Sequence, residues 1–295
     1  MTLGPPFAAR VIATHGRTSL LRDAQHAAWS AVRRGRRADL VVGDRVLASP
    51  SGPGQAAVES IEPRTNLLYR ADEFKTKELA ANIDQVIVVF ASRPSFSRWF
   101  IWRALLAASA AGIDTLVVRN KTDLSEGADA AQQALAELEA LGCRTLSLSA
   151  RTQPDHALDC LAPLTRGRAS LLVGQSGMGK STLLNLLVPD AQALTREYSP
   201  SLNQGRQTTT AARWFDLPDG GAIIDTPGFK EFGLAHLSFE QIVAGLPEFE
   251  PRVGGCRFLD CRHLAEPDCA IRAAVADGRI ATPRYEFYRT LVEAR

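Results

Sequence analysis

The chain of 295 residues is long enough for two or three domains, and a composition of 45% hydrophobic and 22% charged residues is typical of a globular protein. No stretch approaches the ~20 apolar residues that span a bilayer, and the first residues lack the basic start and apolar run of a secretory signal. We therefore expect a cytoplasmic protein that does not enter a membrane. The net charge is only +2.

The charge is unevenly distributed along the chain. Residues 1–70 carry ten arginines and no lysine against five acidic residues, and four of the arginines form one cluster: Arg33, Arg34, Arg36 and Arg37. This asymmetry predicts a basic N-terminal module that faces a polyanion. The alternative is that arginine is simply the common base of this chain, in which case the cluster is a solvated loop.

Short apolar runs separated by turn residues fill the first 70 residues. They lie at residues 10–13, 27–32, 40–46 and 56–61, and a loop rich in Pro, Ser and Gly follows residue 48. This spacing predicts a small all-β barrel.

From residue 83 onward, apolar β-branched runs alternate with helical stretches. Strands are expected at residues 86–90, 115–118, 144–148, 170–173 and 222–224, and helices at residues 99–111 and 129–141. This alternation predicts an α/β domain with a doubly wound parallel sheet. After residue 234 only helices are expected, starting near residues 271 and 283, around a cluster of cysteines.

The sharpest local signal fits the phosphate-loop pattern G-x-x-x-x-G-K-[ST] between a predicted strand and a predicted helix. Its glycines let backbone N–H groups approach phosphates, its lysine reaches the β- and γ-phosphates, and its serine hydroxyl binds Mg²⁺. Thr182 opens the helix that follows. The loop itself consists of Gly174, Gln175, Ser176, Gly177, Met178, Gly179, Lys180 and Ser181.

Three further motifs follow predicted strands. The turn from Asp225 to Gly228 has a carboxylate that could hold Mg²⁺ and an N–H that could contact a γ-phosphate, although D-x-P-G alone is a common turn. The segment from Asn120 through Lys121 to Asp123 has the residue types that bind guanine, because Asp123 can accept hydrogen bonds from two guanine N–H groups that adenine cannot match.

The segment at residues 120–123 could also be a plain loop. The third motif consists of Ser149 and Ala150, which would complete the base pocket by backbone contact. Taken together, these motifs fit a GTPase far more specifically than any of them does alone.

The C-terminal region carries Cys256, Cys261, His263 and Cys269 at close spacing. Three thiolates and one imidazole fill the tetrahedral shell of Zn²⁺ and leave no open position, so we expect one structural zinc ion rather than a catalytic one. Free cysteines in a core are the alternative.

The motif order is unusual, because the base-reading segments precede the phosphate loop. In this respect the chain resembles the circularly permuted GTPases, and the cysteine cluster is similar to the zinc module of the RsgA (YjeQ) family of small ribosomal subunit biogenesis GTPases. The resemblance covers nearly the whole chain. It implies an OB-like barrel over residues 1–72, a permuted P-loop GTPase domain over residues 73–235 and a helical zinc-binding domain over residues 236–295.

The resemblance also implies a function. The chain would hydrolyse GTP with Mg²⁺ bound by Ser181, Asp225 and Thr209 or one of its neighbours Thr208 and Thr210. It would act as a monomer in late maturation of the small ribosomal subunit, binding rRNA, with hydrolysis stimulated by the particle. Where the family usually has a catalytic histidine, this chain has Gln207.

We expect Gln207, Thr209 and Lys180 to be the catalytic residues, with Gln207 orienting the attacking water. Two rival hypotheses remain open from sequence. One is a structural RNA-binding protein whose nucleotide site only orders the fold; intact Lys180, Ser181 and Asp225 argue against it. The other is an ATPase, in which Asp123 would lack its partner on the base.

Overall fold

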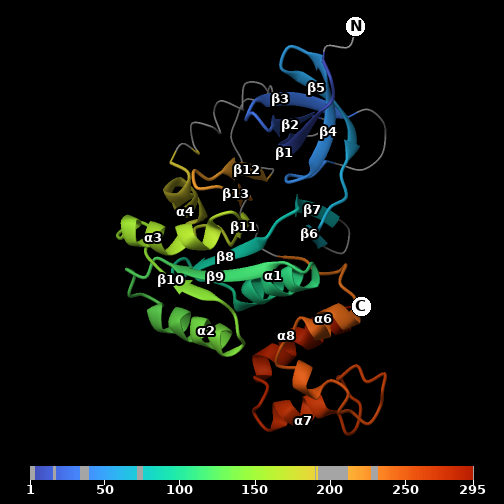
Figure 1. The fold of residues 1–295 in the computed structure, drawn as a ribbon. Coiled ribbons are helices and arrows are strands. Elements are labelled where there is room, and N and C mark those ends of the chain that lie inside the picture. The colour runs from blue at the N-terminus through green and yellow to red at the C-terminus, as the bar shows by residue number, and fades with distance from the viewer. Residues whose placement is uncertain are drawn as a thin grey trace.

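The computed structural model describes residues 4–15, 18–33, 40–71, 76–189, 191, 212–226 and 232–294. Within these ranges eleven strands form one continuous sheet, in the order β10-β9-β8-β11-β13-β12-β1-β2-β3-β5-β4. The two ends of this sheet are built differently: one is a flat parallel sheet with helices, and the other closes into a barrel (Figure 1).

The N-terminal barrel is all-β in its described residues, as expected. Strand β1 pairs antiparallel with both β2 and β4, and β3 pairs with β2 and β5, which closes the ring. Small and β-branched side chains such as Val11, Val46 and Val58 fill its interior. The barrel strands are β1 (Phe7–His15), β2 (Thr18–Asp23), β3 (Ala28–Arg33), β4 (Arg45–Gly52) and β5 (Gln55–Ile61).

The strand expected at residues 40–46 was misplaced, since the strand begins only at Arg45. Gly43 and Asp44 form a turn instead. Gly43 has φ +93°, and a Cβ there would lie 2.0 Å from the carbonyl oxygen of Ala81. The fully buried carboxylate of Asp44 accepts the Val41 N–H at 2.8 Å, which ends the apolar run in a turn.

The parallel sheet is the scaffold of the second region. Its central strand β8 (Gln85–Ala91) is buried along its whole length, as a parallel strand covered on both faces must be. Neighbouring strands run parallel to it, and β12 (Arg213–Asp216) runs antiparallel at the border with the barrel. The other parallel strands are β9 (Asp114–Asn120), β10 (Thr145–Ser147), β11 (Ala169–Val173) and β13 (Ala222–Asp225).

Helices cover both faces of this sheet. Helices α1 (Arg98–Ala110) and α2 (Ala128–Ala140) lie on one face, and α3 (Pro154–Thr165) and α4 (Lys180–Leu187) lie on the other (Figure 1). The doubly wound α/β arrangement expected from the alternating pattern is thus confirmed. Helix α3, which begins with Pro154 in its first turn, was not expected from the sequence.

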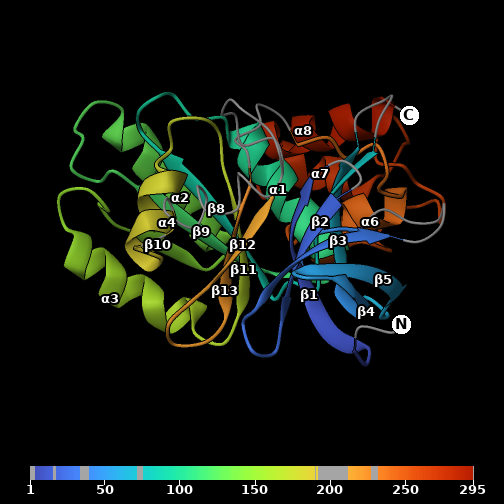
Figure 2. The same cartoon turned by 90° about the horizontal axis from the view of Figure 1, so that it is seen from above.

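The barrel and the sheet meet along a polar seam. Strand β1 pairs with β12, and a hairpin of β6 (Leu67–Ala71) and β7 (Thr76–Ala81) leads into β8. The buried Asn82 carboxamide donates to the Gly43 carbonyl at 3.0 Å and accepts the Thr65 N–H at 2.9 Å. Seen from above in Figure 2, the barrel strands and the central sheet lie side by side.

The C-terminal region is helical in its described residues, as expected. Helix α6 (Phe239–Ala244) begins at a capping box in which Ser238 and Gln241 exchange side-chain-to-backbone hydrogen bonds. It is followed by α7 (Ala270–Ala276) and α8 (Thr282–Glu293). The rings of Trp99 and Trp102 on α1 pack against Phe287 on α8, with centroids 5.6 and 5.4 Å apart.

We predict that Asp44→Ala lowers the free energy of unfolding by about 2 to 4 kcal/mol, because it leaves the Val41 N–H unsatisfied and removes the bidentate partner of Arg64. We expect a smaller loss of stability than for a fully buried ion pair because the Arg64 side chain is 21% exposed. Urea denaturation measures the change. The matched control is Glu59→Ala, on an exposed barrel residue, which should shift stability by no more than about 0.5 kcal/mol. Equal midpoints for the two variants would contradict the assignment.

Candidate functional site

The expected nucleotide motifs meet at one edge of the parallel sheet. Asn120 is the last residue of the parallel strand β9, and Gly174 and Thr226 directly follow the parallel strands β11 and β13. Crevices outside the carboxyl ends of parallel strands are where such sheets bind ligands. A cavity of about 660 Å³ lies there, lined by Asn120, Lys121, Asp123, Leu124, Arg151, Ser176, Gly177, Gly179, Lys180, Ser181, Thr182, Asp225 and Thr226.

The phosphate loop is tightly constrained by its neighbours. A Cβ on Gly174 would lie 2.4 Å from the Val89 carbonyl oxygen, and one on Gly179 would lie 2.2 Å from the Asn120 amide nitrogen. Gly179 also has φ +94°, in the region that side chains avoid. The loop can therefore fold only with glycine at these two places. It ends at helix α4, whose N-terminus faces the cavity with Lys180 and Ser181.

Asn120 joins the base-reading segments to the phosphate loop. Its buried carboxamide donates to the Met178 carbonyl at 3.1 Å and accepts the Ala150 N–H at 3.1 Å. Lys121 acts beside it, because its ammonium donates to the carbonyls of Gly177 at 2.6 Å and Arg93 at 3.0 Å. The segment at residues 120–123, the segment at residues 149–150 and the phosphate loop thus form one hydrogen-bonded unit.

The carboxylate of Asp123 faces the same cavity. It accepts a hydrogen bond from the hydroxyl of Ser149, the other residue expected at the base pocket. This contact orients the carboxylate and leaves its second oxygen available to a ligand. The side of the cavity near Asp123 can therefore present acceptors to a base with two N–H donors.

Lys180 and Asp225 set the electrostatics of the other side. Burial lowers the pKa of Lys180, and the charge of Asp225 opposes that effect. Burial also raises the pKa of Asp225 to about 6, against the attraction of Lys180 and Arg213. Burial thus disfavours the charged form of each group, and the opposite charge of the other partly offsets this effect. The Lys180 ammonium folds over the loop and donates to the carbonyls of Gly174 at 2.7 Å and Gln175 at 3.0 Å.

Most of the nucleotide-site residues expected from the sequence line the cavity or contact residues that do. Four of them do not line the cavity themselves but contact residues that do: Ser149, Ala150, Gly174 and Gln175. The Met178 side chain is buried in the core. Gln207, Thr208, Thr209, Thr210 and Gly228 lie outside the described residues, as do Arg34, Arg36, Arg37 and the side chain of Arg33.

Sequence reasoning missed three lining residues, Leu124, Arg151 and Thr226. Each directly follows an expected site residue: Asp123, Ala150 and Asp225. Their position next to a motif was the available signal. The Thr226 hydroxyl donates to the Leu172 carbonyl at 2.8 Å, which joins the residue after β13 to strand β11.

The phosphate loop also contacts the start of helix α1. The Gln175 side-chain oxygen accepts the Ser97 N–H at 2.8 Å, and the Ser97 hydroxyl in turn caps α1 by accepting the Phe100 N–H at 3.2 Å. Helix α1 carries the tryptophans that pack on α8. Helix α1 therefore connects the phosphate loop, through its N-cap Ser97, with the C-terminal region.

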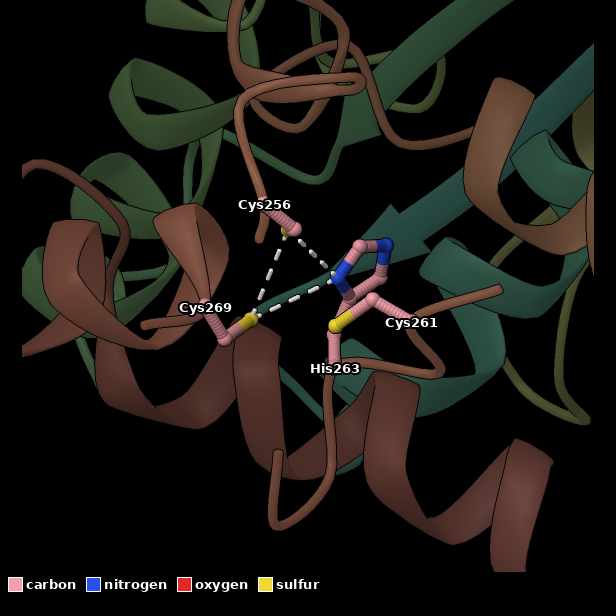
Figure 3. A group of neighbouring side chains, drawn as sticks. All are labelled: Cys256, Cys261, His263 and Cys269. Atoms are coloured by element: carbon pink, nitrogen blue, oxygen red, sulfur yellow. Dashed lines mark hydrogen bonds between the residues drawn. The ribbon is translucent and has the colours of Figure 1, made fainter. Parts of the chain in front are cut away.

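The four expected zinc ligands converge in that C-terminal region (Figure 3). The ligand atoms of Cys256, Cys261, His263 and Cys269 all lie within 4.8 Å of one another. The Cys256 and Cys269 sulfurs are 3.8 Å apart and lie 3.5 and 3.4 Å from His263 Nδ1. Tetrahedral bonds of about 2.3 Å to sulfur and 2.0 Å to nitrogen require separations of about 3.8 and 3.5 Å, so the residues fit Zn²⁺.

Neighbouring groups hold the histidine in place. The Glu266 carboxylate accepts the backbone N–H groups of Arg262, Leu264 and Ala265 at 2.8 to 3.0 Å. These bonds outweigh the effect of burial and lower the pKa of Glu266 to about 2. Burial also lowers the pKa of His263, which favours the neutral imidazole that a metal requires.

Removing one ligand should release the metal and unfold the region around it. We expect Cys261→Ala to lose zinc and to lose hydrogen-exchange protection in α7, since structural zinc contributes about 10 to 16 kcal/mol to such sites. GTP affinity should change little, because the nucleotide cavity contains none of the four ligands. Cys160→Ala, on an exposed side of α3, is the control and should retain one zinc ion per chain. Stoichiometric zinc in both variants would disprove the ligand set.

Comparison with known proteins agrees with this geometry. Residues 61–235 match the family model described as RsgA GTPase. The chain is 48% identical over 284 residues to the "Small ribosomal subunit biogenesis GTPase RsgA" of Burkholderia pseudomallei (strain K96243), covering 96% of this chain and 90% of the relative. It is 47% identical over 286 residues to the protein of the same name from Bordetella pertussis (strain Tohama I), covering 96% and 94%.

Two solved structures share the fold. YjeQ from Thermotoga maritima aligns with a TM-score of 0.74 and 29% identity over 98% of both chains. YloQ, described as a circularly permuted GTPase, aligns with a TM-score of 0.71 and 23% identity over 99% of this chain and 96% of its own. The chain therefore belongs to the RsgA GTPase family and has the fold of a circularly permuted GTPase.

Proposed function

We propose that this chain hydrolyses GTP to GDP and phosphate and acts in maturation of the small ribosomal subunit. The observation that carries the proposal is the single cavity lined by Asn120 and Asp123 at one end and by Lys180, Ser181 and Asp225 at the other. A purine base and a triphosphate need both ends of such a site at once. A relative named as a small ribosomal subunit biogenesis GTPase aligns with 96% of this chain, and this similarity supports the assignment.

The base end favours guanine over adenine. In this proposal Asp123 accepts the ring N–H and the exocyclic amine of guanine, and Ser149 holds its carboxylate in place. Adenine offers no matching pair of donors, and a carboxylate left without its partners disfavours the wrong base strongly. ATP is accordingly the poorer substrate.

The phosphate end supplies positive charge and the Mg²⁺ ligands. The backbone N–H groups from Gly174 to Ser181 surround the β-phosphate, and Lys180 contacts the β- and γ-phosphates. Ser181, Asp225 and Thr209 would hold Mg²⁺, which neutralises the charge that develops on the phosphates. In this proposal the Gly228 N–H would contact the γ-phosphate, and Gln207 would hold the attacking water in line.

The partner in this proposal is the small ribosomal subunit with its rRNA. Ten arginines against five acidic residues within residues 1–70 suit a phosphate backbone. We further propose a cytoplasmic monomer with one zinc ion, divided into the barrel (1–72), the permuted GTPase domain (73–235) and the zinc domain (236–295). Among the described helices, none has the length and apolar character needed to cross a membrane.

Single-turnover hydrolysis tests the proposal directly. The purified chain should cleave GTP faster when purified small ribosomal subunits are added, and it should cleave ATP much more slowly in either case. Lys180→Ala is the negative control, because it removes the ammonium that contacts the phosphates. GTP turnover equal to that of Lys180→Ala, with and without subunits, would disprove the assignment.

Base selectivity provides a second prediction. Asp123→Asn should weaken GTP binding and improve binding of xanthosine triphosphate, because an amide can donate to the xanthine oxygen but cannot accept both guanine N–H groups. We expect selectivity for GTP over the xanthine nucleotide to fall by at least ~100-fold. Nucleotide competition against a fluorescent GDP measures it. Unchanged rejection of the xanthine nucleotide would show that Asp123 does not read the base.

Another prediction concerns Gln207, the residue proposed to position the attacking water. Gln207→Ala should slow hydrolysis by roughly 10 to 100-fold with little loss of GTP affinity, because the lost contact belongs to the transition state. Since an amide does not titrate, the parent rate should stay nearly flat across pH 6 to 8, whereas Gln207→His should be active with a change near pH ~6.5. Single-turnover rates of GTP hydrolysis on the small subunit measure these effects. An alanine variant as fast as the parent would assign the water to another group.

A further inference from the structure

A second cavity of about 410 Å³ lies between helix α6 and the loop that holds the metal ligands, and Cys256, Cys261 and His263 of the zinc cluster form part of its lining. It is separate from the nucleotide cavity, since only residues of the C-terminal region line it. We call it the α6 groove. Apolar side chains, Phe239, Val243, Val253, Phe258 and Leu259, form much of its wall.

Three large apolar side chains are exposed at this groove. Val253 is 54% exposed, Phe258 42%, and Leu259 projects fully into solvent. They make up half of the exposed large hydrophobic residues in the part of the chain that the structure describes. Scattered exposed leucines are ordinary, but three within seven residues around one groove indicate a binding surface.

The loop that presents Phe258 and Leu259 is held at both ends. Cys256 and Cys261 flank it and belong to the four-residue cluster. Within it, the Cys261 N–H donates to the Phe258 carbonyl at 3.3 Å, and the guanidinium of Arg257 lies 5.5 Å from the Phe258 ring centre. An apolar tip that is already ordered loses little conformational entropy when a partner covers it.

The charged side chains that line the groove are acidic. Glu240 and Glu250 are exposed and line it, and no arginine or lysine is among the described residues that do so. The nearby Arg257 pairs with Asp268 at 3.3 Å, and Arg262 stacks over the Phe239 ring at 4.9 Å. Carboxylates on the wall repel a phosphate backbone and attract lysine or arginine.

We propose that the α6 groove binds a short basic protein segment, whose apolar side chain enters the groove next to Phe258 and Leu259 while its lysines or arginines face Glu240 and Glu250. The proposal rests on the proposed function in one respect, because it places this segment on a protein of the small ribosomal subunit. RNA is the alternative occupant, and the charge of the groove disfavours it.

Binding of purified small subunits to the full chain, loaded with a non-hydrolysable GTP analogue, tests the proposal. Phe258→Ser with Leu259→Ser should weaken binding at least ~10-fold, because apolar anchors dominate such interfaces. The control, Leu158→Ser, removes a leucine of α3 whose 36% exposure is close to the 42% of Phe258, and it should bind as the parent does. Zinc content and GTP affinity equal to the parent's show that the variants are folded. Binding unchanged by the double substitution would overturn the proposal.

Charge-reversal variants of the groove distinguish a basic protein segment from RNA as its occupant. Glu240→Lys with Glu250→Lys should weaken binding by roughly 3 to 10-fold at low salt if the occupant is basic. The same substitutions would tighten binding if the occupant is RNA, and either that result or unchanged affinity would overturn the proposal. Failure of the parent itself to bind small subunits would instead count against the proposed function. The two failures are therefore distinguishable.

Discussion

The nucleotide site depends on one carboxamide. Asn120, at the end of β9, donates to the phosphate loop at Met178 and accepts from the base loop at Ala150, both at 3.1 Å. It is 2% exposed, so neither bond can be replaced by water without opening the core. Gly179 is required because any side chain there would occupy the position of this amide. The two halves of the ligand site thus have a fixed separation before a nucleotide arrives.

The same loops contact the rest of the molecule. Gln175 accepts from Ser97 at the start of α1, and the far side of α1 packs its tryptophans on α8 next to the zinc cluster. On the opposite border, β13 pairs with β12 and β12 with β1, so strand β13, which ends at Asp225, belongs to the sheet that also forms the barrel. The three regions share a continuous framework, which is the physical requirement for coupling one site to another.

Local patterns were predictable from the sequence, and long-range pairings were not. The phosphate loop, Asp225, Asp123 and the zinc ligands were identified because their residue types and spacing specify the chemistry within a few positions. The turn at Asp44 was missed because a buried carboxylate interrupts an otherwise apolar run, and its partner Arg64 lies twenty residues away. Arg151 lines the cavity directly after the expected Ala150, but its residue type alone carries no nucleotide-binding pattern, so it was missed. The proposed role of Gln207 stays a prediction.

In the proposed function, the nucleotide in the cavity and the bound small ribosomal subunit influence each other, because hydrolysis is expected to be faster on the particle. The most direct measurement is the equilibrium affinity of the full chain for purified small subunits, loaded first with GDP and then with a non-hydrolysable GTP analogue at one salt concentration. If the two sites are coupled, the chain loaded with the GTP analogue should bind small subunits at least ~10-fold more tightly than the GDP-loaded chain, or ~1.4 kcal/mol, and by reciprocal linkage the particle should favour the analogue over GDP by the same factor. Equal affinity in the two states would contradict this coupling.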